Sequence, residues 1–185
     1  MWRFAFLGIL LLTASPSIRA ATPEVSSLQA FAAGEVISVN LELKNAFEQA
    51  EISRSLESGL PTGFSFQFEL VRKRPNWFDD TLATSTIEVI ATYNSVTREY
   101  LINYRRDGKL VRSETVTNFG QLREKMTRID EPALFQRNRR PSSKLAVRAR
   151  ADISRKVIFY IVPSLVSTEW RQTRVKPGPA PRVQR

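Results

Sequence analysis

The chain has 185 residues, with 28 Lys and Arg against 18 Asp and Glu, and it contains no Cys and no His. This length is sufficient for one domain with its own hydrophobic core. The composition excludes disulfides, metal sites built from thiolates or imidazoles, and catalysis by a Cys nucleophile or a His base. We therefore expect no catalytic residue, no metal and no cofactor, and we expect that the protein is not an enzyme.

The first 20 residues have the layout of a secretory signal peptide. Arg3 precedes an apolar run from Phe4 to Leu12, and small residues follow up to Ala20. The run is shorter than the roughly 20 residues that a membrane-spanning helix needs. We predict cleavage after Ala20 and export to an extracytoplasmic space, the periplasm, with no span in the mature chain. The alternative is an uncleaved anchor, because Ile18 stands where a small residue is usual.

The first half of the mature chain predicts strands and one helix. A weak strand is expected from Val25 to Ala33, and alternating Ile37, Val39, Leu41 and Leu43 predict a second strand over residues 35–43. Asn45 followed by Glu48 has the spacing of a capping box, which predicts a helix from Phe47 to Ser58, closed by Gly59 and Pro61.

The clearest strand pattern is an alternation of aromatic residues. Phe64, Phe66, Phe68 and Leu70 fall on one face of a strand, and four such side chains must be covered by a core. Further strands are expected over residues 81–93, 100–104 and 109–117, with Asp107-Gly108 as the turn of a hairpin.

The last third predicts a second helix and more strands. Phe119, Leu122, Met126 and Ile129 have helical spacing, and Pro132 is expected to end that helix. Residues 131–143 read as an irregular connection, 145–153 as a strand with one basic face, 157–162 as a buried strand, and 165–175 as one more strand or an extended segment. Residues 176–185 read as a disordered tail.

These elements predict an α+β fold in which one β-rich domain spans residues 21–175. The sheet is expected to be mostly antiparallel, curved or folded into a sandwich of about seven or eight strands, with two covering helices.

Positive charge is concentrated in the second half of the chain. Residues 21–100 contain six basic and eleven acidic residues, whereas residues 101–185 contain twenty basic and seven acidic ones. Behind a signal peptide, such a patch favours anionic lipid headgroups, envelope polysaccharide or an acidic protein surface over nucleic acid. The alternative is a solvated basic face. The predicted anion-binding residues are Arg137, Arg139, Arg140, Lys144, Arg148 and Arg150.

Two tryptophans and two aspartates are further candidates. Trp77 and Trp170 stand beside turn or polar residues and are candidate recognition aromatics, with a place in the core as the alternative. Asp79 and Asp80 are the centre of the least favoured hypothesis, a carboxylate-based enzyme. Neighbouring side chains on an extended segment point in opposite directions, so turn-forming aspartates are the simpler interpretation.

The order of several short motifs resembles a known family. The motifs are Ser58-Gly59-Leu60-Pro61, the strand end from Glu69 to Arg74, Thr97 to Tyr100, Val162 to Leu165, and Ser167 to Arg171. In this order they resemble the bacterial family catalogued as domain of unknown function 4390, over about Val25 to Val175. The resemblance implies an exported protein of the Gram-negative-type cell envelope, and it supplies no catalytic residue.

Together these observations predict a non-enzymatic binding or adaptor protein. Its expected partner is a protein of the cell envelope, such as a membrane sensor or an assembly factor. The alternative function is binding of an anionic lipid or polysaccharide through the basic patch.

Overall fold

The computed structural model describes residues 21–75, 78–136, 144–155 and 165–178. The predicted signal peptide, the predicted strand at 157–162 and residues 179–185 of the predicted tail lie outside these residues. The described part forms ten strands, two α-helices and one 3₁₀-helix. None of its helices has the length and apolar character required to cross a membrane.

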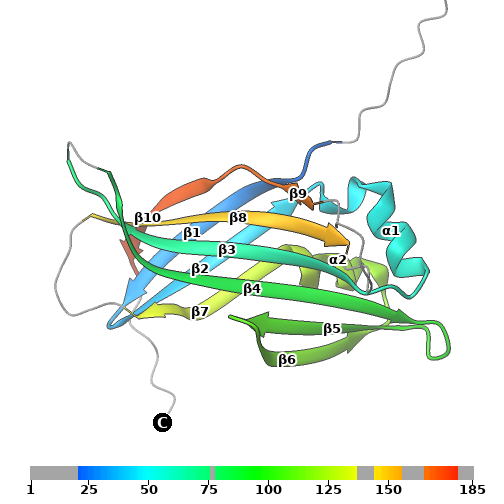
Figure 1. The fold of residues 1–185 in the computed structure, drawn as a ribbon. Helices are drawn as coiled ribbons and strands as arrows, with labels where there is room; N and C mark the ends of the chain where they lie inside the picture. Colours follow the sequence, from blue (N-terminus) through cyan, green and yellow to red (C-terminus); the bar gives the residue numbers. More distant parts are fainter. Residues whose placement is uncertain (1–20, 76–77, 137–143, 156–164, 179–185) are drawn as a thin grey trace, which may run out of the picture.

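The strands form one curled, mostly antiparallel sheet (Figure 1). Its strand order is β6-β5-β4-β3-β8-β10-β1-β2-β7, with β9 paired to β8, and the one parallel pair among them is β1 with β10. This confirms the predicted α+β class, although the sheet has more strands than expected. The strands are β1 Glu24–Ala33, β2 Val36–Lys44, β3 Thr62–Arg72, β4 Asp80–Asn94, β5 Glu99–Arg106, β6 Lys109–Val116, β7 Arg128–Gln136, β8 Leu145–Arg155, β9 Leu165–Ser167 and β10 Arg171–Pro177.

The core lies inside the curl of the sheet. Phe64, Phe66 and Phe68 of β3 are almost fully buried there, as their alternation predicts. Two helices cover one end: α1 (Ala50–Glu57) contributes buried Ile52 and Leu56, and α2 (Phe119–Thr127) contributes buried Leu122 and Met126. Edge-on ring contacts connect Phe47, in the 3₁₀-helix η1 (Ala46–Glu48), to Phe64 and to Phe119 at 5.4 and 5.6 Å between centroids.

The first helix starts differently from the capping-box prediction. Asn45 adopts a left-handed backbone conformation with φ of 60°, and its side chain caps no helix N–H. It donates instead to the carbonyl of Thr22, 3.2 Å away, so the chain makes η1 before α1 begins. The end of α1 is as predicted: Gly59 has positive φ, and the N–H groups of Gly59 and Leu60 bond back to Leu56 and Ser55.

The predicted connection from residue 131 is wrong in its first part. The helix ends at Thr127, and β7 begins at once, with Ile129 opposite Leu41 of β2. Pro132 therefore lies in a strand and does not terminate a helix. It is tolerated because the β2–β7 register shifts beside it, between Glu131 and Phe135, so that a missing N–H breaks no ladder bond.

The tail prediction is also wrong for its first residues. Lys176 and Pro177 belong to β10 and lie opposite Phe31 and Ala32 of β1. The N–H of Gly178 donates to the carbonyl of Ala32 at 2.8 Å. Pairing with β1 holds this segment, although its sequence has no apolar period.

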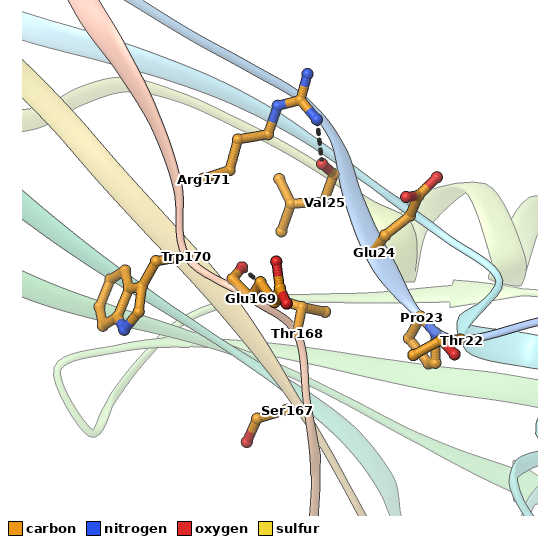
Figure 2. A pocket seen from close by; sticks show the side chains of 9 residues that line it. All are labelled: Thr22, Pro23, Glu24, Val25, Ser167, Thr168, Glu169, Trp170 and Arg171. Atoms are coloured by element: carbon orange, nitrogen blue, oxygen red, sulfur yellow. Dashed lines mark hydrogen bonds between the residues drawn. The ribbon is translucent and has the colours of Figure 1, made fainter.

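A one-residue bulge separates β9 from β10. Ser167 lies opposite Asp152, and Arg171 lies opposite Ala149, so three residues face two on β8. Thr168 fixes the bulge because its Oγ1 accepts the N–H of Ala151 and its own N–H donates to the Ala151 carbonyl, both at 2.9 Å. Such a bulge redirects the side chains beside it; Figure 2 shows Trp170 at its end.

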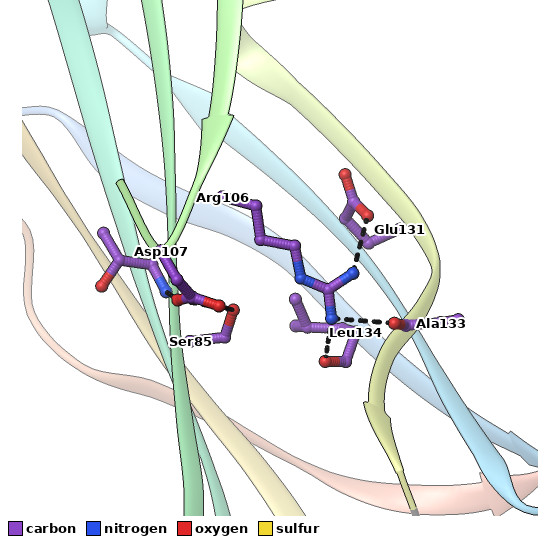
Figure 3. Close-up of polar contacts among 7 residues, drawn as sticks. Ser85, Arg106, Asp107, Glu131, Ala133 and Leu134 are labelled. Atoms are coloured by element: carbon purple, nitrogen blue, oxygen red, sulfur yellow. Dashed lines mark hydrogen bonds and ion pairs between the residues drawn. The ribbon is translucent and has the colours of Figure 1, made fainter. Parts of the chain in front are cut away.

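Arg106 connects two strands that are far apart in the strand order. Its guanidinium, at the end of β5, donates to the carbonyls of Ala133 (2.9 Å) and Leu134 in β7, and it lies 3.9 Å from the carboxylate of Glu131 (Figure 3). Beside it, the Asp107 carboxylate accepts the N–H of Thr86 at 2.8 Å. Arg106 thus satisfies backbone acceptors on the outer edge of β7 and holds the sheet in its curl.

A second polar cluster attaches α2 to β5 and β6. Tyr104 donates to the Glu114 carboxylate at 2.5 Å, and Lys125 of α2 donates to the same carboxylate at 3.3 Å. Burial and the bond to Glu114 raise the pKa of Tyr104. Burial alone would raise the pKa of Glu114, but the hydrogen bonds from Tyr104 and Lys125 and the charges of Lys125 and Arg112 lower it overall.

We expect Glu114→Gln to reduce stability near neutral pH and to reduce it less in acid. A lowered pKa means that the folded state disfavours protonation, so the stabilisation is complete above the ordinary pKa of 4.5 and is lost as pH falls through the lowered value. Urea unfolding midpoints between about pH 6 and pH 3 measure this. Glu124→Gln, which removes an exposed ion pair with Arg128, is the control. A stability gap that stays constant in acid would contradict the assignment.

We expect Arg106→Ala to lower the free energy of unfolding by about 1–3 kcal/mol, because it leaves the β7 carbonyls without their donor. Arg105→Ala is the matched control. Arg105 makes a more exposed 3.9 Å ion pair with Glu88, a type of pair worth about 0–1 kcal/mol. Equal effects of the two substitutions in urea unfolding would show that Arg106 does not hold the curl.

Candidate binding site

The structure divides the predicted basic patch. Arg137, Arg139 and Arg140 lie outside the described residues, as does Trp77. Arg148 and Arg150 lie on the outer face of β8, whereas Lys144 directly precedes the first residue of that strand. The six predicted cations therefore do not form one described surface.

Arg148 and Arg150 are engaged with the neighbouring strand β3. Arg148 donates to the Glu69 carboxylate through Nε at 2.6 Å, and Arg150 donates to the Gln67 side chain at 3.1 Å. The Gln67 amide donates in turn to buried Asp152 at 2.7 Å. These contacts connect β8 to β3 on the outside of the sheet.

Trp170 covers both arginines. Its ring lies 5.3 Å from the Arg148 guanidinium and 5.1 Å from that of Arg150, and the side chain stays partly open to solvent, with 41% of the residue exposed. The structure thus brings together one predicted recognition aromatic and two predicted cations. Within the fold, however, the two arginines already contact the Trp170 ring and side chains of β3.

A hollow of about 510 Å³ lies beside Trp170, between the bulge and the start of β1 (Figure 2). Carboxylates of Glu24 and Glu169 line it together with Arg171, which donates to the carbonyl of Val25 at 3.0 Å. Acidic and basic groups are mixed here. This hollow therefore has no charge preference that would select an anion.

A different hollow lies where β8 and β10 separate. Their last paired residues are Ala146 and Arg174; beyond that point Leu145 pairs with β3, and Val175 pairs with β1. The resulting gap, here called the fork hollow, measures about 600 Å³. It is lined by Lys73, Arg74, Pro75, Lys144, Leu145, Gln172, Arg174 and Val175.

Four cations from β10 and from the residues that follow β3 and precede β8 line the fork hollow, and none of its described lining residues carries a carboxylate. The backbone sets this arrangement: the N–H of Lys73 donates to the carbonyl of Lys144 at 2.9 Å, so the residues after β3 and before β8 are held together. Arg174 of β10 lies on the opposite side of the gap from Lys144. Lys144 and Arg174 are exposed and have no ion pair within the described part of the chain.

The two other cations have counterions. Lys73 pairs with Asp79 and Arg74 pairs with Asp80, both at 2.6 Å. These are the aspartates considered for carboxylate chemistry; in the structure they lie at the end of the β3–β4 connection and pair with the two cations at its beginning. Within the described ranges, no group of three or more acidic side chains is placed to hold a metal ion.

Sequence reasoning included Lys144 but missed Lys73, Arg74 and Arg174 as site residues. The run Arg72-Lys73-Arg74 was visible as a charged strand end. Nothing in a single sequence shows that β8 lies beside β3 and that β10 lies beside β8, which is what gathers these charges.

The fold and the hollow define an α+β protein with a curled sheet and a cationic gap between two separating strands. The chain belongs to the family described as Domain of unknown function (DUF4390), whose model matches residues 20–171. The resemblance of the motifs to this family is thereby confirmed. Comparison with curated proteins and with solved structures gives no match.

Proposed function

We propose that the protein is an extracytoplasmic, non-enzymatic binding protein that holds an anionic group of its ligand in the fork hollow. The observation that carries this proposal is the convergence of Lys73, Arg74, Lys144 and Arg174 on one hollow, where no other described lining residue is a carboxylate.

The charges of the hollow suit a phosphate-like group. An Arg guanidinium presents a planar fork of donors, and Lys ammonium groups add compact positive charge, which together match the oxygens of a phosphate or carboxylate. Asp79 and Asp80 offset two of the four charges and keep Lys73 and Arg74 in place. Lys144 and Arg174 provide the charge that an incoming anion would neutralise.

The sequence supports an envelope location for this ligand. The signal-peptide pattern ends at Ala20, and the family match begins at residue 20. In that compartment the abundant anions are phosphorylated and carboxylated envelope components, which favours them over nucleic acid. The proposal concerns holding a ligand, because a chain with no His or Cys lacks the residues most often used to transform one.

We expect glycerol 3-phosphate to perturb the backbone amide signals of the fork hollow in a saturable NMR titration of the purified protein. The double variant Lys144→Glu with Arg174→Glu should weaken binding at least thirtyfold, since each cation contributes about 1 kcal/mol to holding an anion and the replacement adds repulsion. Raising the salt concentration should weaken binding of the wild type as well.

The control is Lys109→Glu with Arg123→Glu, which changes the net charge equally at exposed sites away from the hollow. Equal loss in both double variants would show a general charge effect. If the amide signals of Trp170 and Arg171 shift and those of the fork hollow do not, the anion binds in the hollow beside Trp170, and the proposal is contradicted.

A second candidate function, docking of an envelope protein, is favoured by the sheet edge at β6. The β7 edge is blocked: Pro132 lies in the strand, and Arg106 occupies two of its carbonyls. The β6 edge pairs with no other strand in the described residues, and Leu110 and Val111 on it are 61% and 57% exposed. An open edge of this type can accept an extended segment of a partner.

We expect Leu110→Lys with Val111→Lys to abolish retention of such a partner from an envelope extract, because charged edge residues oppose strand addition. Val96→Lys with Leu101→Lys is the control, since these residues are exposed apolar side chains that do not lie on β6. The expected result is one partner retained by the wild type and the control and lost by the edge variant. The same proteins retained by all three would count against docking at β6.

A further inference from the structure

We propose that the ligand of the fork hollow is an anionic amphiphile: a lipid whose phosphate is held by the cations and whose acyl chain begins along Leu145 and Val175. This inference rests on the proposed anion site and assigns the ligand class that fits it.

The floor of the hollow is apolar. Leu145 and Val175 line it, and both are half-buried and pack against the hydrophobic core. Pro75 adds a third apolar surface at the rim. The hollow therefore extends from cations at the surface down to side chains that continue into the core.

Strand geometry separates the two kinds of lining. Side chains alternate between the faces of a strand, so Leu145 continues the inward series of Val147 on β8. On β10, Val175 shares the inward side of Thr173, whereas Gln172 and Arg174 point outward with their partners Arg148 and Ala146. Because β8 and β10 separate after Ala146 and Arg174, no strand pairing closes the space between Leu145 and Val175, and both side chains line the gap.

A purely polar anion would contact the cations of the hollow and not its apolar side chains. Inorganic phosphate or an anionic polysaccharide satisfies the cations but leaves Leu145 and Val175 in contact with water. A lipid phosphate satisfies both, because each methylene removed from water strengthens binding by roughly fourfold. A volume of about 600 Å³ is sufficient for a headgroup and the first part of one chain.

The experiment is a chain-length series with the purified protein. Glycerol 3-phosphate, hexanoyl and octanoyl lysophosphatidic acid are titrated below their micelle-forming concentrations, with octanoyl monoacylglycerol as the uncharged probe. We expect affinity to rise roughly fourfold for each added methylene that the floor covers, and then to level off. The monoacylglycerol should bind far more weakly than its phosphorylated counterpart.

Two double variants locate the chain. Leu145→Ser with Val175→Ser should remove the gain from chain length, so that this variant binds octanoyl lysophosphatidic acid no more tightly than it binds glycerol 3-phosphate. Leu110→Ser with Val111→Ser, at the distant β6 edge, should preserve the gain. If the first variant fails to fold, amide shifts of Leu145 and Val175 that grow with chain length in the wild type provide the same readout.

The outcomes separate this inference from the proposed function. Binding of glycerol 3-phosphate with no gain from the chain overturns the amphiphile and leaves the anion site standing, as a polysaccharide ligand would require. Equal binding of phosphorylated and uncharged probes overturns the role of the cations. Failure of every probe to perturb the fork hollow overturns both proposals.

Discussion

The stripe of aromatic side chains on β3 is the constraint on which the fold depends. Phe64, Phe66 and Phe68 must be kept from water, and one flat sheet cannot cover its own face. The sheet therefore curls. On β8, small side chains lie opposite the large ones of β3: Ala151 lies opposite Phe66, and Ala149 lies opposite Phe68. This match of large and small residues lets the sheet bend tightly, and helices are then needed at one end alone.

Curling also creates the fork hollow. β10 pairs antiparallel with β8 near its start and parallel with β1 near its end, so it must leave one neighbour to reach the other. Where it leaves, core side chains approach the surface, and the end of β3 and the start of β8 lie beside the middle of β10. Charged residues are favoured at strand ends because they carry the chain into water. The charged rim and the apolar floor thus have one topological cause.

The sequence allowed most strands to be predicted, because alternation is a local property. The stripe on β3, the Asp107-Gly108 hairpin and the Gly59 cap each depend on neighbours within a few residues. The errors have non-local causes: β7 is a strand because β2 offers Leu41 opposite Ile129, and Lys176 is ordered because β1 pairs with it. Lys144 could be predicted as a site residue because it belongs to a basic stretch of the sequence. Arg174 could not, because it reaches the same hollow only through the pairing of β10 with β8.

The density of basic residues along the sequence does not show which cations lack an acidic partner in the fold. Arg148 and Arg150 belong to the densest basic stretch of the sequence, yet Glu69, Gln67 and Asp152 neutralise or satisfy them under the ring of Trp170. Their contribution is to fix β8 against β3. Because β8 is held there, Lys144 at its start keeps its place beside Lys73, and β10 can turn away from it. The paired arginines thus position Lys144, which has no ion pair within the described part of the chain and belongs to the anion site proposed above.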